Sequence, residues 1–435
     1  MVKNANKTKF YMALVIFSLT GQIAWVVENM YFNVFIYKMF NASATDISTM
    51  VAVSAVVAAL TTIFMGALSD KLGKRKHFIS FGYIIWGITI CFFALIRVDV
   101  ISRLLPTLSA MSVGVTLVIV MDGVMTFFGS TANDACFNAW LTDSSNGGNR
   151  GRVEGINSMM PLVSILVVFG GFMSFNLSLA SSWTTIFLII GIAVIIIGII
   201  GIFIIEEPEI NKGENANYFK NLVHGFKPSV VKENKHFYLL LIAFALFNIS
   251  IQIFMPYLIL YYEVSLGMKD YVFIMAPAII LASIVTAFYG KVYDKFGFLK
   301  SLIAPIVSIT LGYLLLFIFK NVALVFIGSL LMMTGYLTGM SVFGAKIRDL
   351  TPENKSGSFQ GLRIIGQVLI PGVIGPFIGS GVLKNAETIV GNDGTVSFIP
   401  NENVFLAALV AIVVLIGYLT VYFVINNKKS KILAE

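Results

Sequence analysis

The stretch Gly66-Ala-Leu-Ser-Asp-Lys-Leu-Gly-Lys-Arg-Lys76 separates two long apolar runs. Its glycines permit a close approach of helices and a sharp turn, because glycine has no side chain. Asp70 lies near the end of the first run, where its carboxylate can pair with a basic group across the helix interface. The stretch therefore predicts a short charged turn between two helices, although a simple basic anchor would have a similar composition.

A degenerate copy of this stretch argues against a simple anchor. Gly290-Lys-Val-Tyr-Asp-Lys-Phe-Gly-Phe-Leu-Lys300 follows 224 residues later, again between two apolar runs. A second pair, Arg150–Gly155 and Ser356–Gly361, repeats at an offset of 206 residues. Two repeats at similar offsets indicate that the chain consists of two related halves.

The composition places both halves in a membrane. Of the 435 residues, 57% are hydrophobic and only 12% are charged, and the mean hydropathy is +0.88, too apolar for a soluble domain. A helix needs about 20 apolar residues to cross the hydrocarbon core. Twelve runs come close to or exceed this length: 10–40, 46–69, 78–97, 105–141, 153–179, 183–205, 237–263, 271–293, 299–319, 322–346, 359–383 and 403–426.

The lysines and arginines predict the topology. Twelve spans place both termini on one side, and 24 of the 30 basic residues fall on that side. The positive-inside rule makes it cytoplasmic. This distribution excludes a nucleic-acid binder despite the net charge of +8, and we expect a bacterial plasma membrane protein. The other side holds Lys38, Arg97, Arg103, Lys269, Lys320 and Lys384.

The domain organisation follows from a polar gap in the middle. We expect an N-terminal six-helix bundle over 1–205, a cytoplasmic linker over 206–236 and a C-terminal six-helix bundle over 237–435. Apolar residues near Tyr218 recur at helical spacing and predict either an interfacial helix or an ordinary linker helix. The runs 10–40 and 104–140 are too long for a straight crossing, so segment 99–116 is expected outside the membrane.

The stretch 66–76 resembles the signature of the major facilitator superfamily, Gly-x-x-x-Asp-Arg/Lys-x-Gly-Arg/Lys-Arg/Lys-Arg/Lys, at every defining position. The resemblance implies an all-α membrane protein with twelve transmembrane helices in two pseudo-symmetric bundles, which rock to open a central cavity to either side. It also implies a conformational latch at the cytoplasmic ends. Its expected members are Gly66, Asp70, Gly73, Arg75 and Asp294.

A second stretch resembles a narrower family. Residues 133–143, followed by Arg150–Gly155, are similar to helix 4 and its loop in the glycoside–pentoside–hexuronide:cation symporters, which include the melibiose carrier. By this resemblance Asp134 hydrogen-bonds sugar hydroxyls. An ionisable group near mid-membrane is functional by default, and the alternative is a helix-packing hydrogen bond. The sodium-coupled members carry two carboxylates on helix 2 where this chain has Ala58 and Thr62, so a proton is favoured over sodium.

Other polar residues in the apolar runs are candidates for the same cavity. Glu28 is the best proton-coupling candidate and Asp122 a weaker one, although Glu28 could also be a rim residue paired with a neighbouring helix. Amide and aromatic side chains suit a hydroxyl-rich solute, with interhelical hydrogen bonds as the alternative. Arg363 either reaches inward or snorkels to the interface. The expected solute ligands are Asp134, Trp25, Gln22, Asn29, Asn248, Gln252, Arg363 and Gln367.

Several other functions are excluded by missing motifs. The sequence contains no Gly-x-x-x-x-Gly-Lys-Ser/Thr phosphate loop, and its three histidines lie outside the apolar spans. The two cysteines cannot form a disulfide framework. We therefore expect no cofactor, no metal site and no enzymatic activity, and we expect a monomer whose partners are the bilayer, a solute and a proton.

The sequence as a whole predicts a secondary active transporter, with proton-coupled symport of a sugar or glycoside by alternating access as the leading hypothesis. Two alternatives stay open. One is a proton antiporter for drugs or amphiphiles, and the other is a non-transporting sensor with the same fold.

Overall fold

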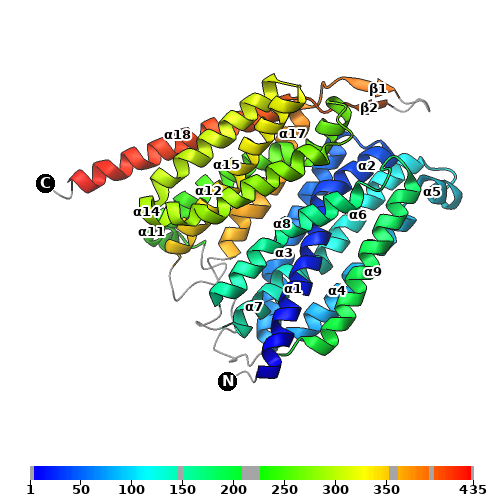
Figure 1. Ribbon diagram of the computed structural model, residues 1–435, viewed down its shortest axis with the longest axis horizontal. Helices are drawn as coiled ribbons and strands as arrows, with labels where there is room; N and C mark the ends of the chain where they lie inside the picture. The colour runs from blue at the N-terminus through cyan, green and yellow to red at the C-terminus, as the bar shows by residue number, and fades with distance from the viewer. Residues whose placement is uncertain (1–3, 146–149, 208–225, 352–360, 391–395, 433–435) are drawn as a thin grey trace. The chain divides into compact units, whose positions relative to one another are not determined.

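The computed structural model describes residues 4–145, 150–207, 226–351, 361–390 and 396–432 (Figure 1). Its contacts divide the chain into two compact units. The first contains Met1–Phe219 with Thr388–Ser397, and the second contains Lys220–Glu387 with Phe398–Glu435. Apart from one two-stranded hairpin, the regular structure of the described ranges is helical.

The first unit contributes six candidate spans from its described residues. They are formed by helices drawn in blue to green in Figure 1. In chain order its elements are α1 (Asn4–Val26), η1 (Val27–Tyr31), α2 (Phe32–Phe40), α3 (Ala44–Leu72), α4 (Lys76–Phe92), η2 (Phe93–Leu95), α5 (Val98–Leu104), α6 (Ala110–Gly129), η3 (Ser130–Phe137), α7 (Asn138–Ser144), α8 (Arg150–Phe172) and α9 (Ala180–Ile204).

The second unit contributes five candidate spans from its described residues. One of them, α14, is 47 residues long, about 70 Å at the rise of a helix, which is twice the bilayer core. Its elements are α11 (Pro228–Glu233), α12 (Lys235–Phe254), η4 (Met255–Tyr257), α13 (Leu258–Leu260), η5 (Tyr261–Ser265), α14 (Val272–Ile318), α15 (Val322–Asp349), η7 (Ile365–Leu369), α17 (Ile370–Val382) and α18 (Asn403–Ile432). The hairpin strands β1 (Thr388–Val390) and β2 (Val396–Phe398) lie in the first unit, apart from the last residue of β2.

Gly297 accounts for the unusual length of α14. Its φ of 71° and ψ of 178° are not helical, so α14 is two helices joined at this residue. Counted this way, the second unit also has six crossings within its described residues, and the predicted twelve-helix architecture is confirmed. The predicted helix near Tyr218 lies in 208–225, outside the described residues.

The two overlong runs differ in detail from the sequence expectation. The run 10–40 contains the π-helical turn η1. The run 104–140 begins at the last residue of the separate helix α5, continues as α6 from Ala110 and contains the π-helical turn η3. The span in this run starts at Ala110, so only the first part of segment 99–116 lies outside it. π-Helical turns inside α-helices are frequent at functional sites.

Small residues bring the helices of each unit close together. A Cβ atom on Gly87 of α4 would lie 2.5 Å from the carbonyl oxygen of Gly191 in α9. In the second unit, a Cβ atom on Gly312 of α14 would lie 2.5 Å from the backbone nitrogen of Met332 in α15. Such contacts replace the hydrophobic driving force that helices lack in lipid. Beside Gly66, by contrast, no atom of the described residues outside its own stretch of helix lies within 4 Å of an added Cβ, and the close approach expected there stays a prediction.

Candidate functional site

Asp134 lies in η3, between α6 and α7 in the first unit. Ser130 Oγ donates a hydrogen bond to Asp134 Oδ2 at 3.0 Å, and the aspartate is half-buried. The indole of Trp25, from α1, faces this carboxyl group, and its N–H has no hydrogen-bond partner among the described residues. A carboxylate acceptor and an unused N–H donor, both expected as solute ligands, therefore lie side by side.

Trp25 is held in place by a second tryptophan and a glycine. Its ring packs against Trp86 of α4 with a centroid distance of 5.0 Å. A Cβ atom on Gly129 would lie 2.9 Å from Trp25 and 2.7 Å from Trp86, so the backbone of α6 supports both rings. Tight packing of this kind fixes the orientation of an aromatic side chain.

Glu28 forms a second polar centre in the first unit. It lies in η1 with 6% of its surface exposed. Its Oε1 accepts hydrogen bonds from Ser54 Oγ of α3 at 2.6 Å and from Thr126 Oγ1 of α6 at 2.8 Å. The same two hydroxyls lie 2.9 Å apart. Glu28 is therefore part of a three-helix hydrogen-bond network and not a rim residue.

Asp122 is the neighbour of this network. Only 1% of its surface is exposed, and it interacts electrostatically with Glu28. Glu28 Oε2 and Asp122 Oδ1 are both buried without a hydrogen-bond partner in the described part of the chain. The ion pairs of that part involve other carboxylates, namely Asp70, Asp143, Asp99 and Glu402. Two candidates that the sequence ranked separately thus form one cluster.

The amide side chains predicted to bind the solute donate mostly to the backbone of their own helices. Asn29 Nδ2 donates to the Trp25 carbonyl at 2.8 Å and is exposed, and Asn248 Nδ2 donates to the Phe244 carbonyl at 2.8 Å and is buried. Gln22 and Gln252 are half-buried. The roles of these amides in solute binding stay predictions.

Arg363 lies at the start of a span in the second unit. Its Nε donates to Gln367 Oε1 at 3.0 Å, so the two predicted residues contact each other. Arg363 is half-buried, and Arg348 is a charged neighbour of the same sign. Its predicted role as a counter-charge to Asp134, which lies in the other unit, stays a prediction.

The turn at 66–76 is built around Arg75, which is 3% exposed. Arg75 Nε contacts Asp143 Oδ2 at 3.0 Å, and its terminal nitrogens donate to Asp70 Oδ1 and to Ser69 Oγ. Gly73 makes the turn possible, with φ at 62°. The predicted sharp turn is therefore present. Asp70 pairs with Arg75 of its own turn, and its pairing with a basic group across the helix interface stays a prediction.

Glu207 completes this network from the end of α9. Its carboxylate accepts the backbone N–H of Arg75, and Oε2 accepts the backbone N–H of Lys76 at 3.2 Å, at the N-terminus of α4. Burial alone would lower the pKa of Arg75, but the attraction of Asp70 and Asp143 outweighs burial and raises the pKa above its ordinary value. The guanidinium therefore stays charged.

The second copy of the turn, 290–300, lacks such a network. Asp294 is exposed and has no ion pair among the described residues. The contact made here is a hydrogen bond from Tyr293 Oη to Asp349 at the end of α15. The proposed latch at Asp294 stays a prediction.

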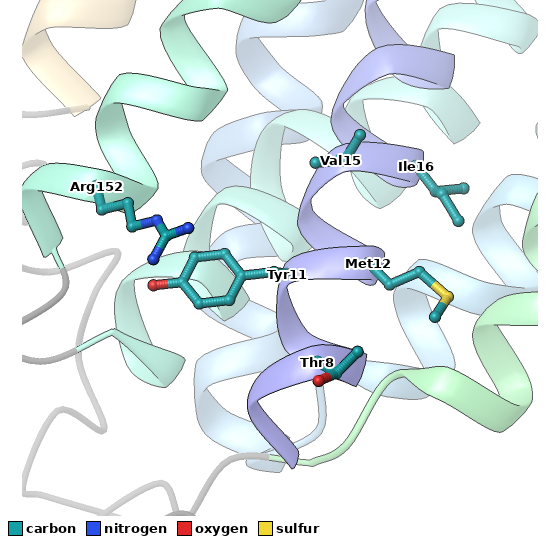
Figure 2. Close-up of a pocket in the computed structure, with 6 residues that line it drawn as sticks. All are labelled: Thr8, Tyr11, Met12, Val15, Ile16 and Arg152. Atoms are coloured by element: carbon teal, nitrogen blue, oxygen red, sulfur yellow. The ribbon is translucent and has the colours of Figure 1, made fainter. Parts of the chain in front are cut away.

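An open groove of about 600 Å³ lies at the N-terminal ends of α1 and α8 in the first unit. Figure 2 shows Arg152 reaching from α8 toward Tyr11 of α1. The guanidinium carbon lies 4.8 Å from the centre of the Tyr11 ring. The groove was not predicted from the sequence, and its lining residues are Thr8, Tyr11, Met12, Val15, Ile16 and Arg152.

Ser54, Thr126, Asp143 and Glu207 are the polar partners that sequence reasoning missed. Their contacts join residues 26 to 132 positions apart, so local periodicity carries no signal for most of them. Asp143 ends the stretch 133–143 that resembles the symporter family, but no role was predicted for it. The acidic pair 206–207, directly after an apolar run, was the available signal for Glu207. Within the described ranges, no group of three His, Cys, Asp or Glu side chains is placed to hold a metal ion.

Comparisons with known proteins place the chain in a family. The model of the Major Facilitator Superfamily matches residues 11–376. No curated protein matches the sequence. A crystal structure of a variant of the nucleoside transporter NupG has a TM-score of 0.71 at 13% identity, covering 94% of this chain and 98% of the other.

A bacterial homolog of the human lysosomal transporter Spinster, in an inward-facing and occupied conformation, gives a TM-score of 0.69 at 17% identity. The match covers 98% of both chains. At these identities the likeness shows the fold alone. Together with the family match and the apolar helices, it shows an integral membrane transporter and not an enzyme. The chain belongs to the Major Facilitator Superfamily of secondary transporters.

Proposed function

We propose that this protein carries a sugar or another glycoside across the membrane together with a proton. The observation that supports this best is the pair formed by Asp134 and Trp25 in the first unit. Sugar hydroxyls donate to carboxylates and accept from N–H groups, and the pair offers one of each. The apolar face of a sugar ring can also pack on an indole.

The proposed proton site is the cluster of Glu28 and Asp122. Two ionised carboxylates near each other in a membrane interior repel, and each costs several kcal/mol to bury. A proton bound between them removes the repulsion, while Ser54 and Thr126 stabilise Glu28 Oε1. Binding and release of this proton would accompany the alternation of the two halves.

Sodium coupling of the melibiose-carrier type is less well supported. Its two helix-2 carboxylates correspond to Ala58 and Thr62 in this chain. The Thr62 hydroxyl donates to the Ala58 carbonyl at 2.8 Å, so it is already used within its own helix. A hard cation at this position would lack charged oxygen ligands.

The topology belongs to the same proposal. We place both termini and the basic turns in the cytoplasm of a bacterial cell, with the protein acting as a monomer. The solved neighbour NupG is a nucleoside transporter, and nucleosides are glycosides with ribose hydroxyls. Nucleosides therefore belong among the solutes to be tested.

Uptake into proteoliposomes tests the proposal. Labelled monosaccharides, disaccharides and nucleosides are offered with and without an inward proton gradient. We expect gradient-stimulated uptake of one class, and a loss of at least about tenfold in Asp134→Asn, because a hydrogen bond to a charged group is removed. Asp270→Asn, at an exposed position, is the matched control.

Three results would overturn the proposal. Uptake that ignores both the proton gradient and Asp134→Asn would exclude the proposed site. Acid-quenched dye efflux without sugar or nucleoside uptake would favour an amphiphile antiporter, and binding without flux would favour a sensor.

A further inference from the structure

The groove between α1 and α8 combines a cation with an apolar wall. Arg152 is exposed, and no ion pair to it occurs among the described side chains. Its guanidinium lies over Tyr11 at 4.8 Å, a cation–π contact that restrains the long side chain. Arg152 is therefore held in position while its charge stays available to an anion.

Tyr11 is itself held in place by other aromatic rings. Its ring contacts Phe10 edge-on at 5.3 Å, and Phe10 packs against Trp140 of α7 at 5.2 Å. Deeper in the unit, Ser18 Oγ donates to Asn157 Oδ1 at 2.5 Å and joins α1 to α8. The groove thus has an aromatic wall that is held in place, on two helices that are bonded to each other.

The polarity of the groove changes with depth. Thr8 lies two residues before the apolar run that begins at Phe10, so we place it near the edge of the apolar core. Met12 and Ile16 follow at one and two helical turns, and Ile16 lies about 12 Å deeper than Thr8. Figure 2 shows this order, with Thr8 at one end, Arg152 and Tyr11 in the middle, and Val15 and Ile16 beyond.

We propose that this groove binds an anionic phospholipid, with Arg152 contacting the headgroup phosphate and the apolar side chains of α1 contacting the start of an acyl chain. The charge matches the phosphate, and guanidinium groups bind phosphate through paired N–H donors. The order from polar to apolar matches the order of groups in a lipid. A soluble anion would have no use for the apolar half of the groove.

Native mass spectrometry of the purified protein tests this site. The protein in detergent is titrated with palmitoyl-oleoyl phosphatidylglycerol or with the zwitterionic phosphatidylcholine of the same chains. We expect preferential retention of phosphatidylglycerol. Arg152→Gln weakens it about tenfold without changing phosphatidylcholine binding. Arg152→Lys keeps part of the preference, because the charge remains but the paired donors are lost.

Controls separate this site from general attraction to basic loops. Lys232→Gln removes one exposed positive charge elsewhere and should leave phosphatidylglycerol binding unchanged. Tyr11→Phe keeps the stacking ring and should retain most of the binding, whereas Tyr11→Leu should weaken it. The proposal is overturned if Arg152→Gln binds phosphatidylglycerol like the wild type, or if Lys232→Gln loses as much. Displacement of the lipid by inorganic phosphate would identify a soluble-anion site instead.

Discussion

The two copies of the charged turn share a glycine at positive φ but not a charge network. Gly73 and Gly297 occupy equivalent positions and both have positive φ, 62° and 71°. Two residues after each glycine the copies differ. The first copy has Arg75, which is 3% exposed, and the second has Leu299, which is 47% exposed. The first turn is held by buried ion pairs, and the second by a hydrogen bond from Tyr293 to Asp349.

This difference separates two roles that the repeated motif combines. Glycine at a positive φ is what makes the chain reverse, and both copies need it. Charge pairing is an additional feature that only the first copy has kept. The second turn should therefore tolerate changes of charge that the first does not, and the following substitutions test this contrast.

The largest loss of stability is expected when Arg75 of the first turn is replaced by leucine, the residue at the equivalent position of the second turn. Arg75→Leu leaves Asp70 and Asp143 without their guanidinium and should cost about 3 kcal/mol, at the lower end for a broken buried pair because both carboxylates are partly exposed. The reverse change, Leu299→Arg, should cost nothing measurable. The melting temperature in detergent, followed with a thiol-reactive dye on the two free cysteines, compares them. Equal shifts would contradict the contrast.

The second effect concerns the two glycines. Gly73 has ψ of 32°, a left-handed conformation that asparagine tolerates, as Asn41 does in this chain with φ of 52°. Gly297 has ψ of 178°, a region almost restricted to glycine. Gly297→Asn should therefore cost about 2 kcal/mol, and Gly73→Asn less than about 0.5 kcal/mol. A larger loss for Gly73→Asn in the same melting assay would reverse this order.

A smaller effect is expected at the paired aspartates. Asp70→Asn keeps a carbonyl acceptor but loses the charge facing Arg75, so it should cost about 1 kcal/mol. Asp294→Asn, at the equivalent exposed position, should leave the melting temperature unchanged. If Asp294→Asn is the more damaging change, Asp294 has a partner that this conformation does not show.

The smallest effect is expected at Tyr293. Tyr293→Phe removes its hydrogen bond to Asp349 on a half-exposed side chain and should cost about 0.5 kcal/mol. Asp349→Asn should give a shift of similar size, since it changes the same contact. Additive losses in the double variant would show that the two residues do not act together.

The sequence predicts the parts of this molecule that depend on local pattern. Apolar run length identified the crossings, and the spacing of Gly73 and Gly297 identified both turns. Asp134 and Trp25 were also predicted to belong to one site. That prediction used the fold implied by the family resemblance and not the local sequence pattern. Local pattern cannot show which hydroxyl meets which carboxyl, so Ser54 and Thr126 were missed.

Two details of the packing could not be predicted from the sequence. The sequence does not show which glycines lie at tight helix contacts, and such contacts occur at glycines such as Gly87. The amide nitrogen of Asn248 donates to the Phe244 carbonyl four residues earlier, and the role of this residue in solute binding stays a prediction. A polar side chain in a membrane helix bonds to its own backbone when no better partner is near.

The central claim is that Glu28 and Asp122 exchange the proton while Asp134 binds the solute. Comparing exchange with accumulation for Glu28→Gln in proteoliposomes tests it most directly. We predict that Glu28→Gln keeps solute exchange at equal pH on both sides, because solute binding is intact, but loses accumulation driven by a proton gradient. Accumulation equal to that of the wild type would contradict the account.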